Sequence, residues 1–173
     1  MGERHAAKAT AGLWCTAVAV ALIGCAPDPT PTPLPTATGF ASEAEAFAAA
    51  EATYRAYVDA LNHQYAGRTG SDPTSYLADA ALEEEVAAAE EFKRMGIRLT
   101  GTVRVASFSI RSASDEVVDA VVCLDVHKSR VLNDENQDVT PTTRGRVVGL
   151  DVAFKIAADT VLISNSSAND SSC

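Results

Sequence analysis

The chain has 173 residues and a formal net charge of -9, from 23 acidic and 14 basic side chains. A surface this acidic repels nucleic acid and anionic headgroups, so we expect no nucleic-acid partner and no phosphate-binding role. Three scattered histidines do not indicate a zinc site, and we expect no metal or other cofactor.

The first 24 residues have the pattern of a secretory signal peptide. Arg4, His5 and Lys8 precede an uncharged apolar run of 12 residues, 13–24. A membrane-spanning helix needs about 20 apolar residues, so this run is short for a span. A basic start, a short apolar run and small residues at its end predict a leader over residues 1–24 that is removed on export.

The string Leu22-Ile23-Gly24-Cys25 resembles the bacterial lipobox, Leu-x-Gly/Ala-Cys. The resemblance implies that the Cys25 thiol carries a diacylglycerol and that the leader is cut just before it. Two acyl chains anchor a protein stably, whereas one holds it only marginally. We therefore expect a lipoprotein on the extracytoplasmic face of the bacterial cell membrane. The alternatives are plain secretion, with Cys25 incidental, and an uncleaved N-terminal anchor.

Residues 25–39 are expected to be the lipidated cysteine and a Pro/Thr-rich linker. Five of the seven prolines of the chain fall in this stretch. Proline fixes φ and donates no backbone hydrogen bond, which favours an extended, semi-rigid spacer. A Pro-rich ligand for an aromatic-lined groove is the alternative.

Residues 40–173 are expected to form one globular domain that begins with helices. Ser42 and Glu45 form a capping box, and apolar residues at helical spacing predict a helix over 43–63. Asp72-Pro73 indicates the start of a short helix. A second long helix is predicted over 80–95, ended by Gly96. Its expected buried side holds Leu82, Val86, Ala89 and either Phe92 or Met95.

After Gly96 the apolar period changes from 3.6 to 2. Alternation over 118–126 and 148–156 predicts two half-buried antiparallel strands. A strand over 97–111 changes phase, which predicts a β-bulge near Ala106-Ser107. A last short strand is expected over 160–165, and a polar loop over about 130–142.

This order predicts an α+β fold in which the N-terminal helices cover a curved, mainly antiparallel four-stranded sheet. It resembles the cone-shaped, nuclear-transport-factor-2-like fold. It is also similar to small actinobacterial lipoproteins that place such a domain after a Pro/Thr linker. A cystatin-like or other helix-on-sheet fold is the alternative.

Loss of Cys15 with the leader and acylation of Cys25 leave two cysteines, Cys123 and Cys173. Export delivers them to an oxidising compartment. Cys123 alternates with the apolar residues of 118–126 and so points to the opposite face, which a returning C-terminal tail could cover. We predict a Cys123–Cys173 disulfide; two free thiols are the alternative.

Few residues indicate catalysis. The D-x-N-x-D string of 134–138 opens like a calcium loop, but Val139 and Gly145 occupy its defining Gly and Glu positions. His63 and His127 fit no nucleophile pattern. Among the tyrosines, Tyr54, Tyr57 and Tyr76 could supply a hydroxyl to a pocket, although core packing is favoured. The acidic run made by Glu83, Glu84, Glu85, Glu90 and Glu91 is expected to be a solvated face.

We therefore expect no catalytic residues and no enzyme activity. The favoured function is a membrane-tethered binding or interaction domain for an envelope protein or a small ligand. The alternatives are a small-pocket enzyme of the isomerase or dehydratase type, and a structural component of the cell envelope.

The lipid anchor predicts a definite mass for the protein extracted from native membranes. Intact mass spectrometry should give a chain that begins at Cys25 and carries at least a diacylglyceryl group. A Cys25→Ala variant should lose both the added mass and the membrane association. A mature chain with an unmodified Cys25 thiol would contradict the anchor.

Overall fold

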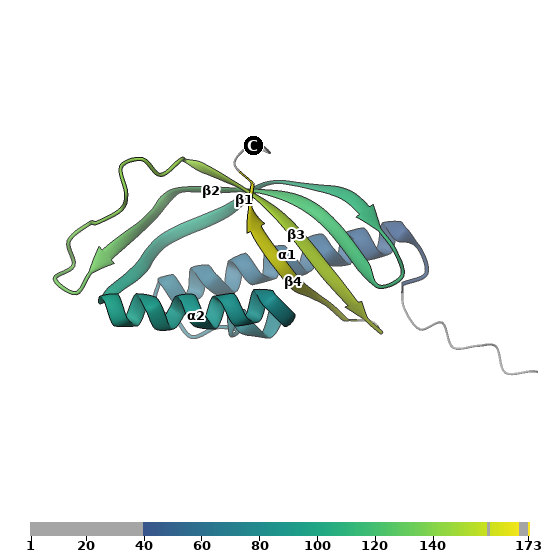
Figure 1. The fold of residues 1–173 in the computed structure, drawn as a ribbon, viewed down its shortest axis with the longest axis horizontal. Coiled ribbons are helices and arrows are strands. Elements are labelled where there is room, and N and C mark those ends of the chain that lie inside the picture. Colours follow the sequence, from purple (N-terminus) through teal and green to yellow (C-terminus); the bar gives the residue numbers. More distant parts are fainter. Residues whose placement is uncertain (1–39, 159, 170–172) are drawn as a thin grey trace, which may run out of the picture. The chain divides into compact units, whose positions relative to one another are not determined.

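The computed structural model describes residues 40–158, 160–169 and 173. The predicted leader, Cys25 and the linker lie outside these residues. The described elements are α1 (Glu43–Tyr65), the short 3-10 helix η1 (Pro73–Tyr76), α2 (Asp79–Met95), β1 (Ile97–Ala113), β2 (Val117–Asn133), β3 (Val147–Ala157) and β4 (Thr160–Ala168) (Figure 1).

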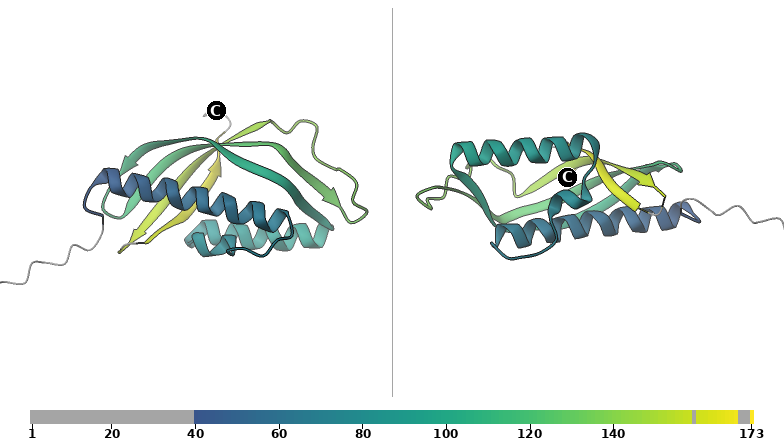
Figure 2. Two further views of the ribbon diagram at one scale, coloured as in Figure 1. Left: turned by 180° about the vertical axis from the view of Figure 1, so that it is seen from behind. Right: turned by 90° about the horizontal axis from the view of Figure 1, so that it is seen from below.

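The four strands form one antiparallel sheet in the order β1-β2-β3-β4. Both helices lie on the same, concave face of this sheet (Figure 1 and Figure 2). The predicted α+β class, the element order and the curved antiparallel sheet are thereby confirmed.

Local sequence signals fix the helix ends. The backbone N–H of Glu45 donates to Ser42 Oγ at 3.3 Å, and the Glu45 carboxylate accepts from the Ala41 N–H at 2.9 Å. Asp72 caps η1 through the Thr74 N–H. Gly96 ends α2 with φ +64, a left-handed conformation that glycine adopts without a Cβ penalty. The predicted cap residues are confirmed, although α1 ends at Tyr65 rather than 63.

Strand β1 bends because its pairing with β2 shifts register three times. The shifts fall between Thr102 and Arg104, between Val105 and Ser107, and between Ile110 and Ser112. The second is the predicted bulge at 106–107. At the first shift the extra residue lies in β2, where Val126 and His127 oppose Val103, and at the other two it lies in β1. Each extra residue raises the local twist of the strand pair and bends it. As a result, apolar residues on both sides of the predicted phase change pack against the one core: Val103, Val105, Phe108 and Ile110.

The first bulge is tied to α1 by a single side chain. The Asn62 Nδ2 group donates to the Val103 carbonyl at 2.9 Å, and Asn62 Oδ1 accepts from the Val103 N–H at 2.8 Å. Val103 is buried and lies between the two paired segments of β1. A buried backbone group without a partner is costly, and Asn62 satisfies both the N–H and the carbonyl of Val103 where the register with β2 is interrupted.

The core lies between α1 and the concave face. Its largest fully buried side chains are Tyr54, Phe154, Ile163, Val118 and Val122. The Tyr54 ring centroid lies 6.2 Å from that of Phe154 and 6.3 Å from that of Phe108, spacings at which aromatic rings attract each other.

The predicted buried side of α2 is wrong for Val86 and Ala89. Of the two alternatives at its end, Phe92 rather than Met95 is partly buried. Val86 and Met95 are 45% and 49% exposed, and Ala89 is exposed. Ala81 is buried, while Leu82 and Phe92 are half-buried. The reason is how α2 is attached. The Ala78 N–H before it donates to the Ile163 carbonyl on β4, and Gly96 after it leads into β1, so only the first turn reaches the core.

The predicted loop over 130–142 is also displaced. Strand β2 runs to Asn133, and the connection to β3 covers 134–146. Strand β1 starts directly after α2, and its first residues, from Ile97 to Thr102, pair with residues of β2 from Asn133 back to Lys128. This backbone pairing overrides the polar composition of the segment.

The predicted disulfide is present between Cys123 and Cys173, with Cα atoms 5.9 Å apart and a sequence separation of 50. It lies on the side of the sheet opposite the helices, where Figure 1 places the C-terminal end. Gly149, the register partner of Cys123, makes room for the tail. A Cβ there would lie 2.3 Å from the Asn169 carbonyl oxygen and 3.0 Å from Cys173 Sγ.

Loss of the disulfide should destabilise the domain by about 4 kcal/mol, because the bond closes a long loop in the unfolded chain. The two-cysteine background is the full chain carrying Cys15→Ser and Cys25→Ser. The test compares urea unfolding of this background with that of the same chain carrying both Cys123→Ala and Cys173→Ala, each with and without a reductant. A reductant should destabilise the two-cysteine background alone. Equal stability of all four samples would contradict the prediction.

Candidate functional site

The inner face of α1 presents a row of tyrosines. Tyr54 is 1% exposed and belongs to the core, whereas Tyr57 and Tyr65 are half-buried and stand beyond it toward α2. Tyr57 lies one turn after Tyr54, with ring centroids 5.9 Å apart. The helical repeat places Tyr65 on the same side two turns further on. The three tyrosines therefore extend from the buried core, at Tyr54, to a partly exposed surface, at Tyr57 and Tyr65.

Helix α2 faces this row of tyrosines with one carboxylate and several alanines. The Tyr57 hydroxyl donates to Glu85 Oε2 at 3.3 Å. Ala81, Glu85 and Ala88 follow each other at four- and three-residue spacing and so share one face of α2. Because alanine fills little space, this face does not close against α1.

The result is a cleft of two adjoining chambers. The first, here the sheet chamber, has a volume of about 340 Å³ and is floored by Leu124, Leu150 and Ile163. The second, here the end chamber, has a volume of about 670 Å³ and lies between the ends of the helices and the start of β1. Tyr65, Glu85 and Ala88 line both.

Burial and charge shape the acid–base properties of the cleft. Burial, followed by the nearby Glu85 carboxylate, raises the pKa of Tyr65 to about 12. The same two causes raise the pKa of Tyr57 further above its ordinary value. Both hydroxyls therefore stay protonated near neutral pH, and serve as hydrogen-bond donors rather than bases.

The structure brings together only some of the residues considered from the sequence. Tyr54 and Tyr57 lie side by side, but Tyr76 and His63 line a separate hollow of about 230 Å³ against η1. Tyr65 and Glu85 were missed. Tyr65 fell beyond the expected helix end. Glu85 fell within an acidic run predicted to be solvated, a prediction that is wrong for this residue. Its spacing with Ala81 and Ala88 was the available signal.

His127 belongs to a separate polar group. Its Nδ1 lies 2.5 Å from Asp125 Oδ1, and Arg104 NH2 lies 2.7 Å from Asp125 Oδ2. The hydrogen bonds from His127 and then Arg104 lower the pKa of Asp125. Cys123 is bonded to Cys173, so its sulfur is not a thiol nucleophile.

The segment 134–138 forms an exposed turn that is held by side chains from the end of β2. Asn133 Oδ1 accepts from the Gln137 N–H at 2.8 Å, and Arg130 Nε lies 3.3 Å from Asp138 Oδ2. Within the described residues, no three His, Cys, Asp or Glu side chains form a group that could hold a metal ion. In the same part of the chain, no helix has the length and apolar character to cross a membrane.

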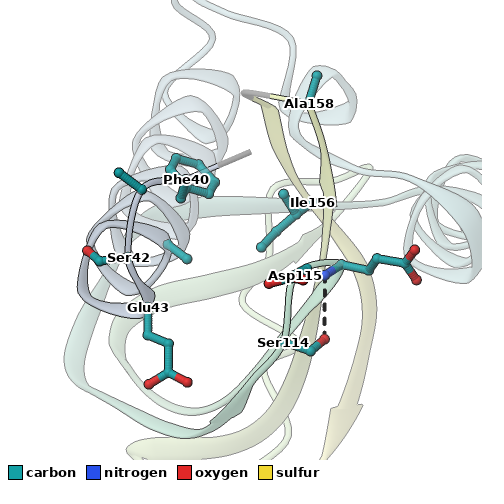
Figure 3. A pocket seen from close by; sticks show the side chains of 10 residues that line it. Phe40, Ser42, Glu43, Ser114, Asp115, Ile156 and Ala158 are labelled. Carbon is teal, nitrogen blue, oxygen red and sulfur yellow. Dashed lines mark hydrogen bonds between the residues drawn. The ribbon is translucent and has the colours of Figure 1, made fainter. Parts of the chain in front are cut away.

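A second hollow lies beside the start of α1 and is shown in Figure 3. It has a volume of about 530 Å³ and opens between Phe40, Ile156 and the turn at Ser114, whose Oγ accepts from the Glu116 N–H. Glu43 and Asp115 on its rim are exposed. Its lining carries these two acidic residues and Glu116 and no aromatic side chain besides Phe40, and we assign no ligand to it.

Comparison with known proteins gives no family. No family model and no curated protein matches the chain. Among solved structures, the intermembrane space region of chloroplast protein ARC6 is similar, with 17% sequence identity and a TM-score of 0.44. The match covers 69% of this chain and 95% of that one. At this level it supports no argument about function.

The raised tyrosine pKa values predict a loss of stability at high pH. A group whose pKa is higher in the folded than in the unfolded state stabilises the fold fully below its unfolded value, here 10.0 for Tyr65. This contribution is lost as the pH rises through the folded value of about 12. Tyrosinate absorbance should follow the ionisation of the tyrosines over this pH range, and urea unfolding should show the fall in stability. Tyr65→Phe should reduce that fall, because it removes one of the ionising groups.

The influence of Glu85 can be separated from burial. Glu85→Gln should lower the pKa of Tyr65, because it removes the negative charge that opposes tyrosinate. Glu83→Gln makes the same chemical change at an exposed position outside both chambers and should leave the titration unchanged. An identical titration in both variants would contradict the proximity of Glu85.

Proposed function

We propose that this chain is an exported bacterial lipoprotein whose domain binds a small ligand in the cleft between α1 and α2, without catalysing a reaction. The observation that carries the binding function is the cleft itself. It has an apolar floor, two tyrosine hydroxyls and a carboxylate at one side. Pockets of this kind, largely apolar with a few converging polar groups, are typical of small-ligand sites.

The anchor and spacer set the location that we propose. Cys25 with its lipobox context would hold the domain at the extracytoplasmic face of the membrane, and the Pro/Thr-rich linker would keep it clear of the surface. The net charge of -9 favours repulsion from anionic headgroups, so the domain would extend away from them.

We also propose that the domain belongs to the cone-shaped, nuclear-transport-factor-2-like architecture. The three register shifts between β1 and β2 and the placement of both helices on the concave face (Figure 1 and Figure 2) support this assignment. Such folds carry both enzymes and binding proteins, so the fold leaves function open.

Binding is favoured over catalysis by the placement of the reactive groups. His63 lines a hollow against η1, and His127 is paired with Asp125 on β2. Tyr57 stays protonated because burial and Glu85 raise its pKa. A proton-transfer enzyme of the isomerase type needs a group whose pKa lies near the working pH, and Tyr57 does not meet that need.

Obstruction of the cleft tests the proposal. Phenylnaphthylamine, a neutral dye that fluoresces in apolar surroundings, should bind the two-cysteine background. Ala88→Phe should weaken this binding by about tenfold or more, because Ala88 lines both chambers and the added ring occupies the space between them.

Ala87→Phe is the matched control, since Ala87 is exposed on α2 and lines neither chamber. It should leave dye binding unchanged. Circular dichroism should confirm that both variants fold. Equal binding by Ala88→Phe and Ala87→Phe would place the dye elsewhere and reject the cleft as the binding site.

A further inference from the structure

The sheet chamber combines aromatic rings with negative charge. Tyr54, Tyr57 and Tyr65 contribute rings to its lining, and the Glu85 carboxylate lies within hydrogen-bond distance of the Tyr57 hydroxyl. Aromatic rings attract organic cations through the negative potential of their faces, and a carboxylate adds direct charge attraction. The chamber therefore contains both groups that proteins use to hold an ammonium ion.

The negative charge of the chamber is not neutralised by a nearby base. Among its described lining residues, the charged side chains are those of Glu84 and Glu85, and neither is in an ion pair within the described part of the chain. Lys93 and Arg98 line only the end chamber. A ligand in the sheet chamber would thus meet two carboxylates and no basic side chain, whereas in the end chamber Glu85 shares the lining with Lys93 and Arg98.

The opposite wall has a different character. Leu124, Leu150 and Ile163 form an apolar floor, with Leu61, Leu77 and Ala81 beside it. Burial of an alkyl group on this floor is favourable in proportion to the apolar area removed from water. A ligand that fits both walls carries a positive group at one end and a short apolar body at the other.

We propose that the sheet chamber of the cleft selects small organic cations: amines or quaternary ammonium compounds with a short apolar chain. The ammonium group lies against Glu85 and the rings of Tyr57 and Tyr65, and the chain lies on the floor formed by Leu124, Leu150 and Ile163. This inference rests on the proposed binding function and adds the chemical class of the ligand.

Charge complementarity argues against the other ligand classes. An anion would meet the Glu84 and Glu85 carboxylates and, before that, the acidic surface of the whole chain. A neutral ligand would displace water from Glu85 and leave its negative charge without a counter-ion, which is unfavourable for a carboxylate removed from water. A cation avoids both costs.

Calorimetric titration of the two-cysteine background with three probes tests the inference. Hexyltrimethylammonium, hexanol and hexyl sulfate share one alkyl chain and differ in head-group charge. The ammonium probe should bind about tenfold or more tightly than hexanol, and hexyl sulfate should bind most weakly.

Two variants place the effect at Glu85. Glu85→Gln should remove most of the advantage of the ammonium probe over hexanol, while hexanol binding changes little. Glu83→Gln removes the same charge from an exposed position on α2 that lines neither chamber, and should retain the advantage. Circular dichroism should establish that both variants remain folded.

The outcomes separate the two proposals. Equal affinity for hexanol and the ammonium probe overturns selection of cations and leaves the binding function intact. An equal loss in Glu83→Gln and Glu85→Gln shows attraction by general surface charge and overturns the assignment to the cleft. If no probe binds the folded protein, the binding function itself fails, and the inference fails with it.

Discussion

The contact between the Asn62 side chain and the Val103 backbone is the constraint on which the arrangement of the domain depends. A sheet curves where one strand of a pair gains an extra residue and the register is interrupted. At the first interruption Val103 of β1 opposes two residues of β2, Val126 and His127, and its backbone N–H and carbonyl bond one amide side chain from α1 at 2.8 and 2.9 Å. The same contact thus permits the bend of β1 and fixes the C-terminal half of α1 against it.

The cleft follows from how the two helices are held. α1 crosses the concave face from Thr53, which donates to the Val161 carbonyl on β4, to Asn62 at β1. α2 is held at its start by the Ala78–Ile163 hydrogen bond and at its end by the direct connection to β1. Each helix is attached mainly to strands, so the space between the helices need not be filled by large side chains. The alanines of α2 leave it open, and Tyr65 and Glu85 border it.

Sequence patterns predicted most of the fold, because caps, alternation and the bulge are local signals. Ser42, Asp72 and Gly96 marked element ends, and the face on which Cys123 lies followed from its position among alternating apolar residues. The extension of β2 to Asn133 was missed because pairing with the start of β1 is a long-range interaction, and local polarity indicated a loop. The exposure of Val86 and Met95 was missed for a related reason. Periodicity identifies the apolar face of a helix but does not say how much of that face reaches a partner.

The residues that line the cleft were harder to predict from the sequence than the helices and strands. Glu85 is one of five glutamates on α2, and composition alone does not distinguish the one that faces Tyr57. That distinction depends on the crossing of α1 and α2, which is set by contacts between segments far apart in the chain. Even the Asn62–Val103 contact joins residues separated by 41 positions, and an asparagine in a helix carries no mark of it in the sequence.

Chemical-shift mapping of the backbone amides, during titration of the two-cysteine background with hexyltrimethylammonium, shows where on the domain the ligand binds. The largest shifts should lie along the cleft, at Tyr57, Tyr65, Glu85 and Ala88, and on its floor at Leu124 and Leu150. Shifts concentrated in the hollow beside the start of α1, around Phe40 and Glu116, or spread evenly over the surface, would contradict binding in the cleft.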